Sequence, residues 1–154
     1  MTESAHPAAI TAFNEANALF KQGQWPEALA RVDEALALEA AMELGWLLKA
    51  RCLVRLNEWM PAREAFAQTL RLNAANYSAW LEAGHLCKQM GELQQAAMSY
   101  QRAIDVSPER FEALLGMARV MGQMGNLQLA ERAHLDAAAK AEGAERVHQV
   151  HHLM

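Results

Sequence analysis

Residues 77–110, YSAWLEAGHLCKQMGELQQAAMSYQRAIDVSPER, predict two short amphipathic helices joined by a tight turn. In the first half, apolar and small side chains recur at helical spacing and form one stripe. A second stripe lies between Gly91, which favours a left-handed turn, and Pro108, which prevents the helix from continuing. Helices this short need neighbouring helices to bury their apolar faces.

The same pattern recurs along the chain at a spacing of 34 residues. Three columns of different chemistry share this register. A small residue in the first helix is provided by Ala16, Ala50, Gly84 and Ala118. The turn is provided by Gly23, Asn57, Gly91 and Gly125. The middle of the second helix is provided by Val32, Phe66 and Tyr100, with His134 in the fourth copy. Such agreement indicates an internal repeat of one helical hairpin.

The repeat resembles the tetratricopeptide repeat (TPR) family over about residues 9–144. The residues that match the family pattern are Trp80, Leu81, Gly84, Gly91, Ala96, Tyr100, Ala103 and Pro108. The resemblance implies an all-α fold, an α-solenoid of about four helix-turn-helix repeats that form a right-handed superhelix. In such a fold the first helix of each pair lines a concave groove.

The expected domain organisation follows from this register. Residues 1–8 form an N-terminal tail, and residues 145–154 form a short C-terminal helix, either a capping helix or the start of a fifth repeat. The TPR repeats are expected at about 9–42, 43–76, 77–110 and 111–144. The apolar pattern at the C-terminal end stops unfinished, which favours a chain cut from a longer protein.

Composition limits the class of protein. The chain has 154 residues and a hydrophobic content of 53%, which suits one domain with a core spread along a solenoid. A net charge of −4 argues against nonspecific nucleic-acid binding. No apolar run is long enough to span a membrane, and no signal peptide is recognisable, so we expect a cytoplasmic protein. Cys52 and Cys87 lie on apolar helical faces and are expected to be buried free thiols.

Catalytic motifs are absent from the sequence. There is no Gly-rich phosphate loop, no nucleophile elbow, no Cys-x-x-Cys and no His-Glu-x-x-His, so we expect no enzyme activity and no cofactor. His148 and His152 share a helical face, a spacing that can bind a metal. They lack a neighbouring cysteine or carboxylate, so we expect no metal site there.

The groove implied by the TPR resemblance is the candidate binding site. Its positions carry five Lys or Arg against two Glu, although the chain as a whole is acidic. Arg51 and Arg55 are four residues apart on one helix, so both can reach one carboxylate. The alternative is that these are ordinary solvated charges. The candidate peptide-binding residues are Phe13, Asn17, Phe20, Lys21, Leu48, Arg51, Arg55, His85, Lys88 and Arg119.

Two known TPR binding patterns are missing from these positions. The dicarboxylate clamp of chaperone adaptors would need Lys, Asn or Arg at five places, of which only Asn17 matches. The other four places hold Phe13, Leu48, Ser78 and Glu82. The Asn ladder of O-linked sugar transferases would be met by Asn14 alone.

The leading hypothesis is a protein-interaction scaffold or adaptor that binds a peptide or partner protein in a locally basic groove. The partner segment would carry acidic groups and a few apolar anchors. A competing hypothesis makes the chain the N-terminal TPR array of a larger bacterial enzyme, such as a glycosyl- or sulfotransferase. A third hypothesis is self-assembly into a homo-oligomer through a C-terminal edge formed by Val147, Val150 and Leu153.

Overall fold

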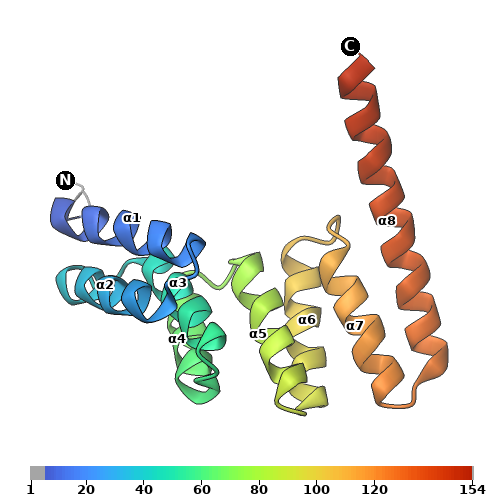
Figure 1. The fold of residues 1–154 in the computed structure, drawn as a ribbon. Helices are drawn as coiled ribbons and strands as arrows, with labels where there is room; N and C mark the ends of the chain where they lie inside the picture. Colours follow the sequence, from blue (N-terminus) through green and yellow to red (C-terminus); the bar gives the residue numbers. More distant parts are fainter. Residues whose placement is uncertain (1–5, 154) are drawn as a thin grey trace. The chain divides into compact units, whose positions relative to one another are not determined.

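The computed structural model describes the backbone of residues 6–153 and the side chains of residues 6–145. This part of the chain forms eight α-helices and no strand (Figure 1). The helices are α1 (Pro7–Lys21), α2 (Trp25–Leu38), α3 (Glu43–Arg55), α4 (Trp59–Leu72), α5 (Tyr77–Gln89), α6 (Leu93–Val106), α7 (Glu112–Gln123) and α8 (Leu127–Leu153). The predicted all-α class is confirmed, as is the pairing of the helices into hairpins.

Each hairpin turns at the residue that the 34-residue register predicts. The φ angles are positive at Gly23 (80°), Asn57 (61°), Gly91 (81°) and Gly125 (86°). In the first turn the amide of Gly23 donates to the Phe20 carbonyl and the amide of Gln24 donates to the Leu19 carbonyl, both at 3.0 Å. These two bonds form a Schellman motif, which satisfies the last carbonyls of the helix. The turn column of the sequence is therefore confirmed as a column of left-handed helix ends.

The helices group into two compact units, one ending at Ala75 and the other beginning at Asn76. In the first unit α1 packs against α2, α2 against α3, and α3 against α4. In the second unit α5 packs against α6, α6 against α7, and α7 against α8. Within each unit every helix thus packs against its neighbours in the chain, as in a helical-repeat protein.

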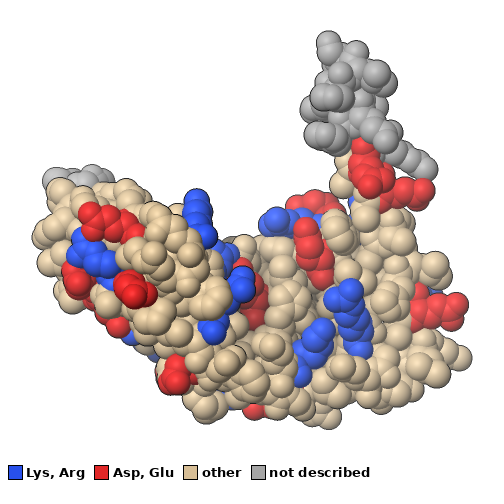
Figure 2. All heavy atoms as spheres, in the orientation of Figure 1, with Lys and Arg blue, Asp and Glu red and all other residues tan. Residues whose placement is uncertain are grey.

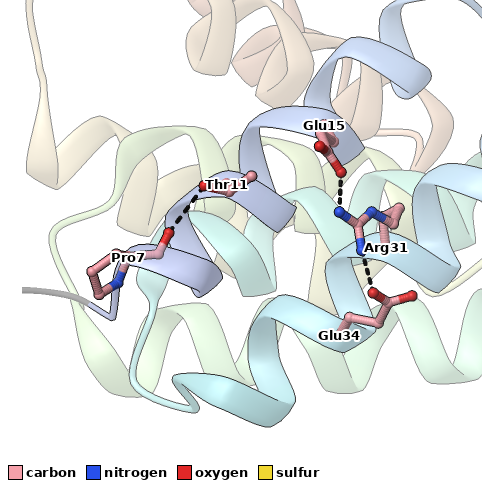
Figure 3. Close-up of polar contacts among 5 residues, drawn as sticks. All are labelled: Pro7, Thr11, Glu15, Arg31 and Glu34. Carbon is pink, nitrogen blue, oxygen red and sulfur yellow. Dashed lines mark hydrogen bonds and ion pairs between the residues drawn. The ribbon is translucent and has the colours of Figure 1, made fainter.

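Polar contacts support the start of α1 and join α1 to α2. His6 precedes α1, and its Nδ1 accepts a hydrogen bond of 3.2 Å from the amide of Ala8. The Thr11 hydroxyl donates to the Pro7 carbonyl at 3.1 Å (Figure 3). Figure 3 also shows Arg31 of α2 between Glu15 of α1 and Glu34 of its own helix. Because all three charged groups are substantially exposed, these ion pairs add little stability and chiefly fix how α1 faces α2.

The last helix differs from its prediction. Residues 145–153 do not form a separate short helix, because α8 runs without a break from Leu127 to Leu153. Its buried face consists of Ala130, Ala133 and Ala137, whereas His134 is exposed. The side chains of the expected self-assembly edge and of the histidine pair lie outside the described side chains.

Three other features considered in the sequence are the cysteines, possible metal ligands and membrane-spanning segments. Cys52 and Cys87 are buried free thiols, as predicted, and burial raises the pKa of the Cys52 thiol to about 11. Among residues 6–145, no cluster of histidine, cysteine and carboxylate side chains could hold a metal ion. No helix of the described chain is both long and apolar enough to cross a membrane.

Candidate peptide-binding surface

The predicted groove residues of α1 lie at the edge of the first unit's core. Phe13 and Phe20 are half-buried and pack against a core cluster. This cluster consists of Ala16, Ala28, Val32, Leu48 and Cys52. Asn17 is half-buried on the same helix, and Lys21 is exposed in its last turn. The α1 positions therefore present a partly apolar surface with a basic group at one end.

Leu48 is a core residue, which corrects its predicted role as a surface residue of the groove. Its side chain is only 3% exposed and packs among small residues of α1 and α2. The reason is the small volume of its neighbours Ala16 and Val32, which leaves a space that a leucine fills.

Arg55 contacts two aromatic side chains. Its guanidinium carbon lies 5.8 Å from the ring centre of Phe20 in α1 and 5.4 Å from that of Trp25 in α2. The residue itself remains exposed in the last turn of α3. Arg51 lies one turn earlier and is half-buried. Cation–π contacts of this kind hold a guanidinium at an apolar edge while its N–H groups remain able to bind an anion.

Trp25 is a residue of this surface that sequence reasoning missed. It occupies the apolar column that also contains Trp59, Leu93 and Leu127, and that column predicts packing rather than contact with a basic side chain. The contact depends on the tertiary arrangement of α2 and α3, which Lys49 also joins through an ion pair of 2.9 Å with Asp33.

In the second unit, His85 lies beside the buried Tyr100 of α6. The Tyr100 hydroxyl is 2.6 Å from His85 Nδ1, and the two rings meet edge to face with their centres 5.4 Å apart. Tyr100 is fully buried, whereas His85 lies at the surface with its ring partly covered. The hydroxyl of a core residue thus reaches a histidine at the surface.

Two glycines make room for the Tyr100 ring. A Cβ atom added at Gly84 of α5 would lie 2.7 Å from a ring carbon, and one at Gly116 of α7 would lie 2.6 Å from another. Both distances are shorter than van der Waals contact, so the ring occupies the space that side chains at these positions would need. The helices α5 and α7 also join through Tyr77, whose hydroxyl accepts from the amide of Ala113 at 3.1 Å.

Lys88 and Arg119 complete this part of the surface. The pKa of His85 is lowered, and burial is the largest cause. The positive charges of Lys88 and Arg119 lower this pKa further, whereas the negative charge of Glu82 raises it. Lys88 and His85 belong to α5, whereas Arg119 belongs to α7. Figure 2 shows Lys and Arg side chains gathered over α5 and α7. His85 and Lys88 thus share a face of α5, and the charge of Arg119 in α7 acts on the same histidine.

At equivalent positions of the repeat, the cores of the two units hold side chains of different volume. A shift of two repeats places Ala16 on Gly84, Val32 on Tyr100 and Leu48 on Gly116. In the first unit a valine packs beside an alanine and a leucine, and in the second a tyrosine packs between two glycines. In the second unit the ring of Tyr100 thus fills the space that the Leu48 side chain fills in the first unit. Its hydroxyl also brings a polar group to the surface.

These features define a helical-repeat protein. The sequence matches the tetratricopeptide repeat family over residues 13–59 and 81–145. The chain therefore belongs to the TPR family, as the resemblance of its third repeat predicts. A search of the curated proteins finds no match.

Solved structures agree with this fold. A crystal structure of MamA has a TM-score of 0.87 at 18% identity, over 92% of this chain and 84% of MamA. The first TPR of Spaghetti (RPAP3), bound to the HSP90 peptide SRMEEVD, has a TM-score of 0.75 at 20% identity, over 77% and 94% of the two chains. The Arabidopsis OM64 TPR domain has a TM-score of 0.74 at 20% identity, over 76% and 97%. At these identities the similarity concerns the fold.

Proposed function

We propose that this protein is a non-enzymatic interaction module that binds a peptide or partner protein through the first helices of its repeats. The partner segment carries acidic groups and apolar anchors, and binding needs no cofactor. The observation that carries this proposal is the position of Arg55. Its exposed guanidinium lies over Phe20 and Trp25, so one surface offers both a cation and aromatic area.

Two further facts support the proposal. The TPR of Spaghetti is bound to a peptide, SRMEEVD, that is rich in carboxylates. The present chain has Phe13 and Leu48 at two of the clamp positions, and Leu48 is buried. We therefore expect recognition of an acidic segment through residues other than those of the dicarboxylate clamp.

The test is affinity capture from the native lysate with the full chain. We expect the wild-type protein to retain a partner that the Arg51→Glu/Arg55→Glu variant loses, because the substituted carboxylates repel an acidic segment. A matched control is Arg71→Glu/Arg102→Glu, which changes the net charge equally on exposed positions of the second helices α4 and α6. Equal capture by all three proteins would contradict the proposed surface.

A further inference from the structure

We propose that His85, Lys88 and Arg119 form a binding site for one carboxylate group of an acidic peptide, with Tyr100 fixing the orientation of the His85 ring. This site rests on the proposed function, because it specifies the chemistry of a peptide ligand in the second unit. Its residues differ from the clamp positions of chaperone adaptors, where this chain has Ser78 and Glu82.

The geometry begins with the Tyr100 ring. The ring lies between Gly84 and Gly116, and its hydroxyl is 2.6 Å from His85 Nδ1. Because Tyr100 is fully buried between α5 and α7, its hydroxyl has a fixed position. The edge-to-face contact of the two rings, with an angle of 63° between their planes, restrains the imidazole further.

Proton positions follow from the chemistry of this pair. Burial raises the pKa of Tyr100 to about 12, so the phenol keeps its proton at neutral pH. A phenol O–H donates readily, and His85, whose pKa is lowered, is neutral at that pH. His85 Nδ1 therefore accepts the hydrogen bond from Tyr100. A neutral imidazole carries one proton, so that proton is on Nε2, which becomes a hydrogen-bond donor for a ligand.

The charges near His85 favour an anion. Lys88 is three residues after His85 on the same helix, so the two side chains share a face. Arg119 is three residues after Gly116 on α7, so it shares a helix face with the position that lies against the Tyr100 ring. Its charge lowers the pKa of both His85 and Tyr100. Glu82 of α5 is the acidic group that acts on His85. Among the described residues, neither Lys88 nor Arg119 forms an ion pair. A carboxylate between these cations would offset their mutual repulsion.

Binding of a carboxylate should change the protonation of His85. The protonated imidazole interacts better with an anion than the neutral ring does, so the pKa of His85 rises when the ligand binds. By linkage, the affinity for the carboxylate increases as the pH falls through the histidine range. When the ring is protonated, Nδ1 donates and the Tyr100 oxygen accepts. Tyr100 thus acts as a positioning residue, because it holds the ring but does not touch the ligand.

The experiment uses NMR of the imidazole nitrogens in the full chain at constant ionic strength. The probes are three penta-alanine derivatives: one blocked at both ends with a central Glu, one blocked with a central Gln, and one with a free C-terminal carboxylate. We expect saturable shifts of His85 Nε2 and a raised His85 pKa with at least one carboxylate peptide and none with the Gln peptide. The two carboxylate probes distinguish a side-chain ligand from a C-terminal one.

Variants test the assignment of each residue. Lys88→Gln/Arg119→Gln should weaken carboxylate binding roughly tenfold or more, because two charge-assisted contacts are lost. Arg71→Gln/Arg102→Gln is the matched control and should bind as the wild type does. Tyr100→Phe keeps both cations but should weaken binding and move the His85 nitrogens toward a mixture of tautomers. Unchanged thermal midpoints identify the folded variants to be compared.

The inference is overturned if the Gln peptide shifts His85 equally, or if the Lys88→Gln/Arg119→Gln variant keeps wild-type affinity. A partner that is lost by the Arg51→Glu/Arg55→Glu variant but retained by Lys88→Gln/Arg119→Gln would reject this carboxylate site and keep the proposed function. Carboxylate binding at His85 without any captured partner would reject the proposed function and keep the site.

Discussion

At the scale of single residues, the packing around Tyr100 depends on two glycines. Neither Gly84 nor Gly116 has a positive φ angle, so the absent side chain matters here for space and not for backbone conformation. The ring that fills this space is fully buried and hydrogen-bonded to His85. It therefore has little freedom to move away from a new atom.

Gly116→Ala should lower the free energy of unfolding by about 1–3 kcal/mol, because its new methyl group would overlap the Tyr100 ring. The new Cβ would lie 2.6 Å from two ring atoms. Gly143→Ala is the matched control, since a Cβ there meets nothing within 4 Å and a helical glycine is replaced by a better helix former. Urea unfolding monitored by circular dichroism measures both. Equal effects of the two substitutions would contradict the packing described.

The lowered pKa of His85 predicts a dependence of stability on pH. In the unfolded chain the histidine pKa returns to about 6.5, so that state binds more protons than the folded state over the window just below this value. The free energy of unfolding should therefore fall as the pH decreases through this window. His85→Gln should show a smaller decrease than the wild type in unfolding experiments from pH 7.5 to pH 5. Identical slopes would mean that the folded protein does not perturb this histidine.

The sequence predicts part of this residue-scale picture. The 34-residue register assigns Tyr100 to the core and Gly84 to a column of small residues, and both are confirmed as buried. The register does not predict that Gly116 and Tyr100 replace Leu48 and Val32 as a pair, because its columns group residues by chemistry and not by summed side-chain volume. A comparison of side-chain volumes two repeats apart would have found this exchange and the burial of Leu48.

At the scale of helices and turns, a residue with a positive φ angle marks the turn inside each hairpin. Three of the four turns use glycine, and the second uses Asn57 at a φ of 61°. Asparagine tolerates this conformation better than other residues with a side chain, and glycine adopts it without steric cost.

Gly91→Ala should destabilise the protein by about 1–2 kcal/mol, because alanine resists the left-handed conformation although no atom blocks its Cβ. Asn57→Gly keeps the conformation available and should change stability much less. Thermal unfolding of the two variants beside the wild type measures the difference. If Gly91→Ala were neutral, the left-handed turn would not be required for this hairpin.

Helix ends were predictable where a turn residue or proline marks them, and not elsewhere. The end of α6 at Val106 precedes Pro108, as expected. The boundary expected near residue 145 rested on repeat length alone. Gly143 is the only helix-weakening residue there, and one glycine costs about 1 kcal/mol, which an alanine-rich segment tolerates. As a result α8 continues to Leu153.

At the scale of the whole molecule, the chain contains two compact units of two helical hairpins each. The TPR family and the hairpin order were predictable because the repeat is periodic along the whole chain. The candidate surface is predicted less completely. The contact of Arg55 with Trp25 joins two neighbouring hairpins, and the contact of His85 with Tyr100, although it lies within one hairpin, depends on side-chain geometry that the periodicity does not give.

Stability in such a protein is a sum of repeat terms and nearest-neighbour terms, so damage should stay local. Gly116→Ala is therefore expected to speed amide hydrogen exchange in α5, α6 and α7 far more than in α1, α2 and α3. Mass spectrometry of peptic fragments can compare the helices in one experiment. A uniform increase across all six helices would show that the units unfold as one cooperative body.

The exchanged volumes in the two cores also bear on how the chain assembles during synthesis. Hairpins of similar sequence can dock on the wrong neighbour, a characteristic failure of repeat proteins. Here a hairpin that brought Leu48 against Tyr100 would be overpacked, and one that set Gly116 beside Val32 would enclose a void; both errors are unfavourable. The volumes of three side chains in each unit therefore disfavour docking on the wrong hairpin and favour assembly of the repeats in chain order.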